Sequence, residues 1–243
     1  MDMTNNTSMI FDTETNGLFP KISFTPNWNE IDISTFPYII QLSYVIIDEN
    51  TNNILTISDA YIKIPRDIII SDFVSSINGI TNKQLDRHGV DLIIEMEKFM
   101  KYYIESKKII GHNLSFDMNM ILVSIIRIIE EYKDVDDKID EYNKWINYYN
   151  IAYFKWRECG LCTMRTNTKL CNIWVKKTNS EGVYLKFPKL SELHEKLFSS
   201  SVYQLHNSLI DVFVCLRCYY FNTHNIDLVK SNKVFKQLYL LIQ

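Results

Sequence analysis

The segment Ile10–Leu18, with the sequence IFDTETNGL, places two carboxylates at the end of an apolar stretch. The stretch is typical of a buried strand, and we expect one from Ser8 to Asp12. Residues two apart on a strand point to the same face, so Asp12 and Glu14 are predicted to project from one side of a sheet. Gly17 then marks a turn where the backbone can approach a ligand closely.

Two later segments carry two further carboxylates and a histidine. In residues 110–117, IGHNLSFD, Asp117 lies one turn into an apolar helical pattern. In residues 206–211, HNSLID, Asp211 belongs to a second helical pattern. His206 precedes Asp211 by five residues, whereas helical neighbours on one face are three or four apart. We therefore expect His206 in a loop just before the helix.

Four carboxylates brought together would repel one another and would be costly to bury. Divalent cations remove that conflict, and oxygen-rich sites suit Mg²⁺ or Mn²⁺. Taken singly, each segment has an ordinary explanation: Asp-x-Glu is usually a solvated loop, and an acid in the first helical turn is favoured by the helix dipole. The conjunction of three segments, each in a suitable strand or helix context, favours a metal site.

The remaining pattern is strands followed by alternating helices and strands. We expect a hairpin of 38–48 and 54–64 around the turn-rich residues 49–53, and a strand over 108–111. Helices are expected over 92–104, about 114–131, 189–198, 206–222 and 226–241. This order predicts an α/β fold with a mixed sheet flanked by helices, and the active site of such a sheet lies at the strand ends.

In this order, the three segments resemble those of the DnaQ-like DEDDh 3′→5′ exonucleases, of the proofreading type seen in phages and large DNA viruses, over about residues 8–219. Ser76–Thr81 resembles the Gly-Ile-Thr turn of that family, with Asn78 where a histidine is usual. The resemblance implies a ribonuclease-H-like mixed β-sheet flanked by α-helices. It also implies a single exonuclease domain over 1–243, with insertions at about 19–37 and 132–158.

The resemblance implies an enzyme that removes nucleotides from the 3′ end of single-stranded or frayed DNA by two-metal phosphodiester hydrolysis. Asp12, Glu14 and Asp211 would hold two Mg²⁺ or Mn²⁺ ions, with Asp12 bridging them, and Asp117 would support the second ion. His206 would be the general base, since imidazole exchanges protons near neutral pH.

The same resemblance assigns substrate contacts. Leu18 falls at the position that presses on the 3′-terminal base, and backbone groups of Thr13 and Glu14 would meet the 3′-hydroxyl. Asn113 would line the terminal-nucleotide pocket, as would the remaining candidates Thr15, Gly17, His112 and Phe116. The expected partner is a single-stranded 3′ end, DNA in preference to RNA, and a polymerase or a replication or repair complex is a candidate. The sequence gives no indication of oligomeric state.

Three alternatives remain open. An RNA-directed exoribonuclease could share all these residues, because none of them reliably reads a 2′-hydroxyl. An inert nucleic-acid-binding module should have lost an acid or the histidine, and none is lost here. A zinc-dependent interaction domain could use the pairs Cys159-x-x-Cys162 and Cys215-x-x-Cys218, but the second pair lies on the apolar face after Asp211, where buried thiols are common.

Composition adds weaker constraints. The net charge of −3 provides no global basic field for nucleic acid. No run approaches the roughly 20 apolar residues that span a bilayer, so we expect no membrane association and a cytoplasmic location. For the insertion at 132–158 the sequence favours a surface loop with a local apolar cluster. For the insertion at 19–37, that reading and a role in shaping substrate choice are left open.

Overall fold

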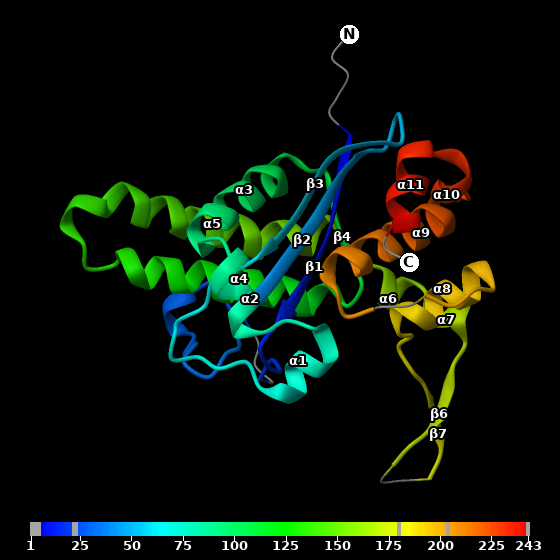
Figure 1. The fold of residues 1–243 in the computed structure, drawn as a ribbon, viewed down its shortest axis with the longest axis horizontal. Helices are drawn as coiled ribbons and strands as arrows, with labels where there is room; N and C mark the ends of the chain where they lie inside the picture. Colours follow the sequence, from blue (N-terminus) through cyan, green and yellow to red (C-terminus); the bar gives the residue numbers. More distant parts are fainter. Residues whose placement is uncertain (1–5, 21–23, 179–180, 203–204, 242–243) are drawn as a thin grey trace.

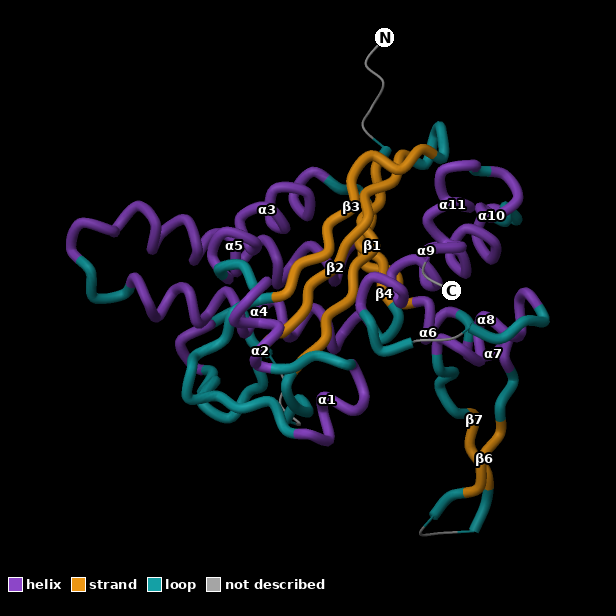
Figure 2. Tube along the Cα trace, viewed as in Figure 1, coloured by secondary structure: helices purple, strands orange, loops and turns teal. Residues whose placement is uncertain are grey.

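The computed structural model describes residues 6–20, 24–178, 181–202 and 205–241, and a five-stranded sheet forms its centre (Figures 1 and 2). The strand order is β3-β2-β1-β4-β5; β1 pairs antiparallel with β2 and parallel with β4, and β4 pairs parallel with β5. The expected mixed sheet is confirmed. The strands are β1 (Thr7–Thr15), β2 (Ile39–Asp48), β3 (Asn53–Tyr61), β4 (Lys108–Gly111) and β5 (Gly160–Cys162).

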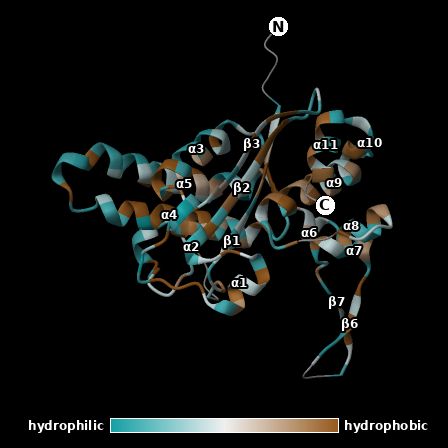
Figure 3. Ribbon diagram, in the orientation of Figure 1, coloured by the Kyte–Doolittle hydropathy of each residue, from teal (hydrophilic) through white to brown (hydrophobic). Residues whose placement is uncertain are grey.

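Helices cover both faces of this sheet, because side chains of β1 alternate between two apolar cores. Met9 and Phe11 belong to the core shared with α3 (Leu92–Glu105), α4 (Leu114–Tyr132) and α5 (Ile139–Cys159). Ile10 points the other way. It joins the core of α8 (Leu190–Phe198), α9 (Ser208–His224), α10 (Leu228–Ser231) and α11 (Lys233–Leu241). Figure 3 shows hydrophobic residues along the central strands between these layers.

Strand β1 is longer than expected. It continues past Asp12 to Thr15 because β2 pairs with it over that length, with Asp12 opposite Ser43 and Glu14 opposite Gln41. Both carboxylates therefore belong to the strand itself, and the turn at Gly17 follows them.

The family's Gly-Ile-Thr turn joins two short helices, α1 (Asp72–Asn78) and α2 (Asn82–His88). Gly79 ends α1 with a left-handed φ of 74°, a conformation that glycine adopts without strain. Thr81 begins α2 through a reciprocal capping box with Gln84. These two helices have too few apolar residues for their periodicity to predict them.

The expectation of a surface loop over 132–158 is wrong, because most of it forms α5. Trp145, Tyr149 and Ala152 are fully buried. Their spacings of four and three residues place them on one helix face, which packs in the core shared with α4. A charged connection that includes the 3-10 turn Asp136–Lys138 precedes the helix.

The insertion at 19–37 is also packed on the core, although its residues 21–23 lie outside the described part. Phe24, Ile31 and Phe36 are each at most 7% exposed. Arg127 of α4 donates hydrogen bonds to the carbonyl oxygens of Phe36 at 2.7 Å and Pro37 at 2.9 Å. The inserted segment therefore covers α4 rather than extending into solvent.

The single helix expected over 226–241 is two helices, α10 and α11, separated at Asn232. Its side-chain oxygen accepts a hydrogen bond from the backbone nitrogen of Phe235 at 2.9 Å, which caps α11. Between β5 and α8, the chain forms two short helices and a hairpin that the sequence pattern did not predict. They are α6 (Thr163–Thr166), α7 (Thr168–Cys171), β6 (Trp174–Lys176) and β7 (Val183–Leu185). None of the helices in the described ranges is long and apolar enough to cross a membrane.

Candidate active site

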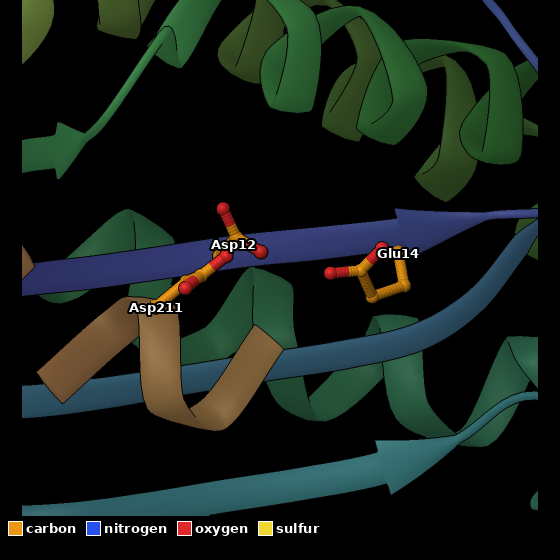
Figure 4. Close-up of side chains that lie close together, drawn as sticks. All are labelled: Asp12, Glu14 and Asp211. Carbon is orange, nitrogen blue, oxygen red and sulfur yellow. The ribbon is translucent and has the colours of Figure 1, made fainter. Parts of the chain in front are cut away.

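Three of the four predicted carboxylates converge beside β1. Asp12, Glu14 and Asp211 each present an oxygen atom, and these atoms lie within 4.8 Å of one another. Figure 4 shows Asp12 and Glu14 projecting from the strand and Asp211 approaching from α9. The cluster joins residues separated by almost 200 positions in the sequence.

The alternation of β1 explains this convergence. Asp12 and Glu14 point to the same face as Ile10, which is the face that α9 covers. Asn207 begins α9, its side-chain oxygen accepting from the backbone nitrogen of Ile210 at 3.4 Å. Asp211 thus lies in the first turn of the helix, where the partial positive charge of the helix dipole favours an acid.

Asp117 reaches the same strand from the opposite face. Strand β4 pairs with β1 only as far as Ile10, so the edge of β1 beyond that residue is free. The Oδ1 atom of Asp117 accepts hydrogen bonds there from the backbone nitrogen of Thr13 at 3.0 Å and from its hydroxyl at 2.8 Å. Both donors of Thr13 are therefore used to hold Asp117, which is only 2% exposed.

The carboxylates of the site are buried and lie close together, and both effects raise their pKa values. Burial, then the charges of Asp117, Asp211 and Glu14, raise the pKa of Asp12 well above its ordinary value. Burial followed by the charge of Asp211 raises the pKa of Glu14 to about 8, and the Asn78 side chain offsets part of this. Burial is also the main cause that raises the pKa of both Asp117 and Asp211 to about 7.

These donors suit a divalent metal. The Oδ1 atom of Asp211 is buried and has no hydrogen-bond partner in the described structure, a costly state for a polar atom. A cation between Asp211, Asp12 and Glu14 would satisfy that atom and neutralise the repulsion. Carboxylate oxygens are the ligands that Mg²⁺ and Mn²⁺ prefer.

His206 lies in the loop before α9, as predicted. Its side chain is exposed, and its φ of 79° is in the left-handed region that few non-glycine residues adopt. Its backbone nitrogen donates to Oδ2 of Asp211 at 3.4 Å. The backbone of the loop that carries His206 is thereby linked to this carboxylate.

A buried polar network that sequence reasoning missed fixes the start of α9 on the sheet. Ser208 is fully buried; its hydroxyl contacts that of Ser43 at 2.5 Å, and its backbone nitrogen donates to Oε1 of Gln41 at 3.3 Å. The Gln41 amide and the Ser43 hydroxyl both donate to Oδ1 of Asp59, at 2.8 and 2.7 Å. A glutamine and a serine two residues apart, on a strand otherwise apolar, are the signal that could have indicated it.

Of the predicted substrate residues, Thr15 ends β1, Gly17 is half-buried in the bend that follows, and Leu18 is exposed. Leu18 is 93% exposed, so its side chain has no packing role in the fold. The Thr15 hydroxyl donates to the carbonyl oxygen of Gly17 at 2.8 Å, and Tyr38 donates its backbone N–H to the Asn16 side chain at 2.6 Å. A Cβ atom at Gly17 would be 3.6 Å from Pro37, an ordinary contact, so the fold itself does not require glycine there.

Asn113 and Phe116 lie at the start of α4. Asn113 is exposed, with a left-handed φ of 64°. The ring of Phe116 is partly buried and meets that of Phe19 edge-on, with centroids 6.1 Å apart. The first inserted segment therefore contacts one of the predicted substrate residues.

His112 has both ring nitrogens engaged within the chain. Nδ1 lies 3.0 Å from the hydroxyl of Thr163, and Nε2 lies 3.0 Å from the carbonyl oxygen of Pro188. A carbonyl can only accept, so Nε2 carries the proton. The Thr163 hydroxyl lies between Nδ1 and the carbonyl oxygen of Gly111, to which it donates at 3.2 Å. Burial lowers the pKa of His112 to about 4, which keeps the ring neutral at pH 7. We find His112 placed to hold two chain segments together.

The cysteines do not gather into a metal site in the described residues, where the carboxylate cluster is the sole group of three or more metal-ligand side chains. All five are free, and Cys215 and Cys218 are buried on α9. Burial raises the pKa of both thiols.

The sequence matches the model of the RNase T exonuclease family over residues 9–219. The chain belongs to this exonuclease family. It is a DnaQ-like DEDDh exonuclease of ribonuclease-H-like fold, from a metal-dependent group of nucleases. No curated protein matches the sequence significantly.

Among solved structures, the fold is similar to E. coli Exonuclease I in complex with a dT13 oligonucleotide, with a TM-score of 0.57 and 15% identity. The zinc-ion-bound form of the E. coli ExoI–ssDNA complex gives the same values. Each match covers 97% of this chain and 43% of the other. This exonuclease chain therefore spans less than half the length of those proteins.

Proposed function

We propose that this chain is a metal-dependent 3′→5′ exonuclease that removes nucleotides from single-stranded or frayed DNA. The observation that carries the proposal is the convergence of Asp12, Glu14 and Asp211, with one carboxylate oxygen buried and unpartnered. In its ionised form such a cluster is unfavourable unless cations neutralise it, and the family supplies the reaction class.

Asp12, Glu14 and Asp211 would hold two Mg²⁺ or Mn²⁺ ions, and Asp117 would support them. When bound, the ions would stabilise charge on the attacking and leaving oxygens of a phosphodiester. Asp117 would contribute its second oxygen, since its first is held by Thr13.

His206 would accept the proton of the attacking water. Two observations support this role: the side chain of His206 is exposed, and its backbone nitrogen donates to Asp211 of the carboxylate cluster. A base at this site is worth about 10²–10⁴-fold in rate.

The 3′-terminal nucleotide would lie against the turn after β1 and the start of α4. Leu18 would press on the terminal base, which gives its exposed side chain a function. Close approach of the strand to the Gly17 backbone would explain a glycine that the fold does not require. Asn113, Phe116 and the backbone near Thr15 would complete the pocket, and His112 would support its wall.

The oligonucleotide-bound structures similar to this fold contain DNA, which supports DNA as the substrate. An exoribonuclease of the same fold is the second candidate, because no 2′-hydroxyl contact distinguishes the two sugars. A polymerase or repair complex is a candidate partner.

The test compares 5′-labelled and 3′-labelled single-stranded DNA and RNA of one sequence, with Mg²⁺, with Mn²⁺ and with EDTA. We expect a ladder of shortened products from 5′-labelled DNA, immediate release of labelled mononucleotide from 3′-labelled DNA, and no cleavage in EDTA. Asp12→Asn should abolish cleavage, whereas the exposed Asp136→Asn should retain it. Cleavage that starts at the 5′ end or persists in Asp12→Asn would refute the proposal.

A further inference from the structure

The chain is acidic overall, but one segment is strongly basic. Residues 164–189 contain a single acidic residue, Glu181, and six basic ones, which gives this segment a net charge of +5 and leaves −8 on the remainder. The six are Arg165, Lys169, Lys176, Lys177, Lys186 and Lys189. Within the described residues, Lys186 is the one member of this set that forms an ion pair, with Glu192 at 2.6 Å.

This segment contains the hairpin of β6 and β7, which projects from the body of the molecule (Figures 1 and 2). Its ladder includes hydrogen bonds from Lys186 to Ile173 at 2.9 Å and from Lys177 to Gly182 at 3.1 Å. The two strands pair only with each other. Side chains on both of its faces are exposed, and a two-stranded ribbon of this kind has little stability of its own in water.

Both aromatic and basic side chains are exposed on this hairpin. Trp174 and Lys176, two residues apart on β6, share one face, and Tyr184 lies on the other. Trp174 is 58% exposed and Tyr184 is 48% exposed. The indole nitrogen of Trp174 donates to the Asn172 side chain at 2.9 Å, which fixes the ring while leaving it accessible.

The base of the hairpin is attached at the edge of the sheet that carries the active site. His112 follows β4 and bonds to Thr163, at the start of the segment, and to Pro188, at its end. The Thr163 hydroxyl also lies 3.6 Å from Sγ of Cys215, one turn beyond Asp211 on α9. One neutral imidazole thus anchors both ends of the hairpin segment beside the helix that supplies a site carboxylate.

We propose that the β6–β7 hairpin is an accessory binding arm for single-stranded DNA that leads to the active site; the inference rests on the proposed nuclease function. Lysines would contact phosphates, and Trp174 and Tyr184 would stack on bases, the combination that binds single strands without sequence preference. A protein partner fits less well, because the cores of protein interfaces are depleted in lysine.

The test measures binding of a labelled single-stranded DNA of about 30 nucleotides, longer than the ~4–16 nucleotides that one single-strand-binding fold occupies. Anisotropy is recorded in EDTA, so that no cleavage occurs, over a series of salt concentrations. Lys176→Glu with Lys177→Glu should lower the salt slope by about 1.4, since each phosphate contact on a single strand contributes about 0.7. Trp174→Ala should weaken binding about 5- to 150-fold.

The matched control is Lys233→Glu with Lys236→Glu, two exposed lysines on α11, away from the hairpin. It should bind within about twofold of wild type, and circular dichroism should show that all variants are folded. Arm variants that bind like this control would overturn the inference. Unchanged DNA binding together with a changed sedimentation coefficient would do so as well, and would make the hairpin an interface between copies of the chain.

A failure of the proposed binding arm can be distinguished from a failure of the proposed nuclease function. Hydrolysis of a dinucleotide with Mg²⁺ tests the carboxylate site with a substrate too short to span to the arm. In the arm variants, kcat/KM on the long strand should fall relative to kcat/KM on the dinucleotide. A wild-type protein that hydrolyses neither substrate would refute the nuclease proposal, and the binding measurement in EDTA would still decide whether the arm holds DNA.

Discussion

Removing the charge of Asp211 should stabilise the metal-free protein, and the gain should depend on pH in a defined way. The folded protein raises the pKa of Asp211 from 3.8 to about 7, mainly through burial. Between those values the folded state holds a proton that the unfolded state has released. The free energy of unfolding of the wild type must therefore fall as pH rises through this window.

The size of the effect follows from the same values. Each pH unit corresponds to about 1.36 kcal/mol, so a rise from 3.8 to about 7 corresponds to about 4 kcal/mol. Asp211→Asn has no proton to release and avoids this loss. The charge of Asp211 also raises the pKa of Asp12 and Glu14, so those groups will ionise more readily in the variant.

Urea unfolding in EDTA, at several values between about pH 4 and pH 8, measures the difference. We expect the stability of Asp211→Asn relative to wild type to grow across this range by about 4 kcal/mol. Adding Mg²⁺ at about 100 times its dissociation constant should raise the free energy of unfolding of the wild type by about 2.7 kcal/mol, and should leave that of Asp211→Asn unchanged. The control Asp136→Asn should follow the wild type at every pH. A difference that is flat with pH would show that Asp211 is not held protonated by its surroundings.

Three further predictions concern single side chains. His206→Ala should lower kcat about 10²–10⁴-fold while leaving Mg²⁺ affinity within a few-fold. Its residual activity should rise with pH, because hydroxide replaces the base. Activity near that of the exposed control His88→Ala would exclude His206 as the general base. Leu18→Ala should not change the melting temperature, because the side chain is 93% exposed, but should lower kcat/KM on DNA; unchanged steady-state kinetics would remove the proposed contact with the terminal base. Gln41→Leu leaves the Ser208 backbone nitrogen without its acceptor, so the free energy of unfolding in urea should fall by about 1–3 kcal/mol. Mg²⁺ affinity should also fall, because α9 would be misplaced. A loss of stability with unchanged Mg²⁺ affinity would limit Gln41 to a structural role.

The sequence predicted the mixed sheet and the convergence of Asp12, Glu14 and Asp211 at β1, because both depend on the local periodicity of strands and helices. The alternation of a strand places Asp12 and Glu14 on one face whether or not the strand ends where expected. Helical spacing likewise predicted that His206 falls outside α9. The spacing of Trp145, Tyr149 and Ala152 carried the same kind of information, but the charged residues before them obscured the helix.

What could not be predicted depends on contacts between distant segments. His112 was assigned to the substrate pocket, yet its two partners lie 51 and 76 residues away, and nothing in the local sequence indicates them. Asp117 was expected among the metal ligands; its engagement by Thr13 depends on β4 ending early enough to free the edge of β1. The β6–β7 hairpin buries too few side chains for its sequence to show an apolar periodicity.

The position of Asp211 has a consequence for how the protein is made. The ribosome releases the chain from its N-terminus, so β1, β2 and α4 can pack before α9 has been synthesised. Until then Asp12 and Glu14 lack the third member of the cluster, Asp211, and the loop that carries His206. A nascent chain is thus expected to remain without nuclease activity while most of its sheet has already formed, until α9 has been synthesised and has docked on the sheet.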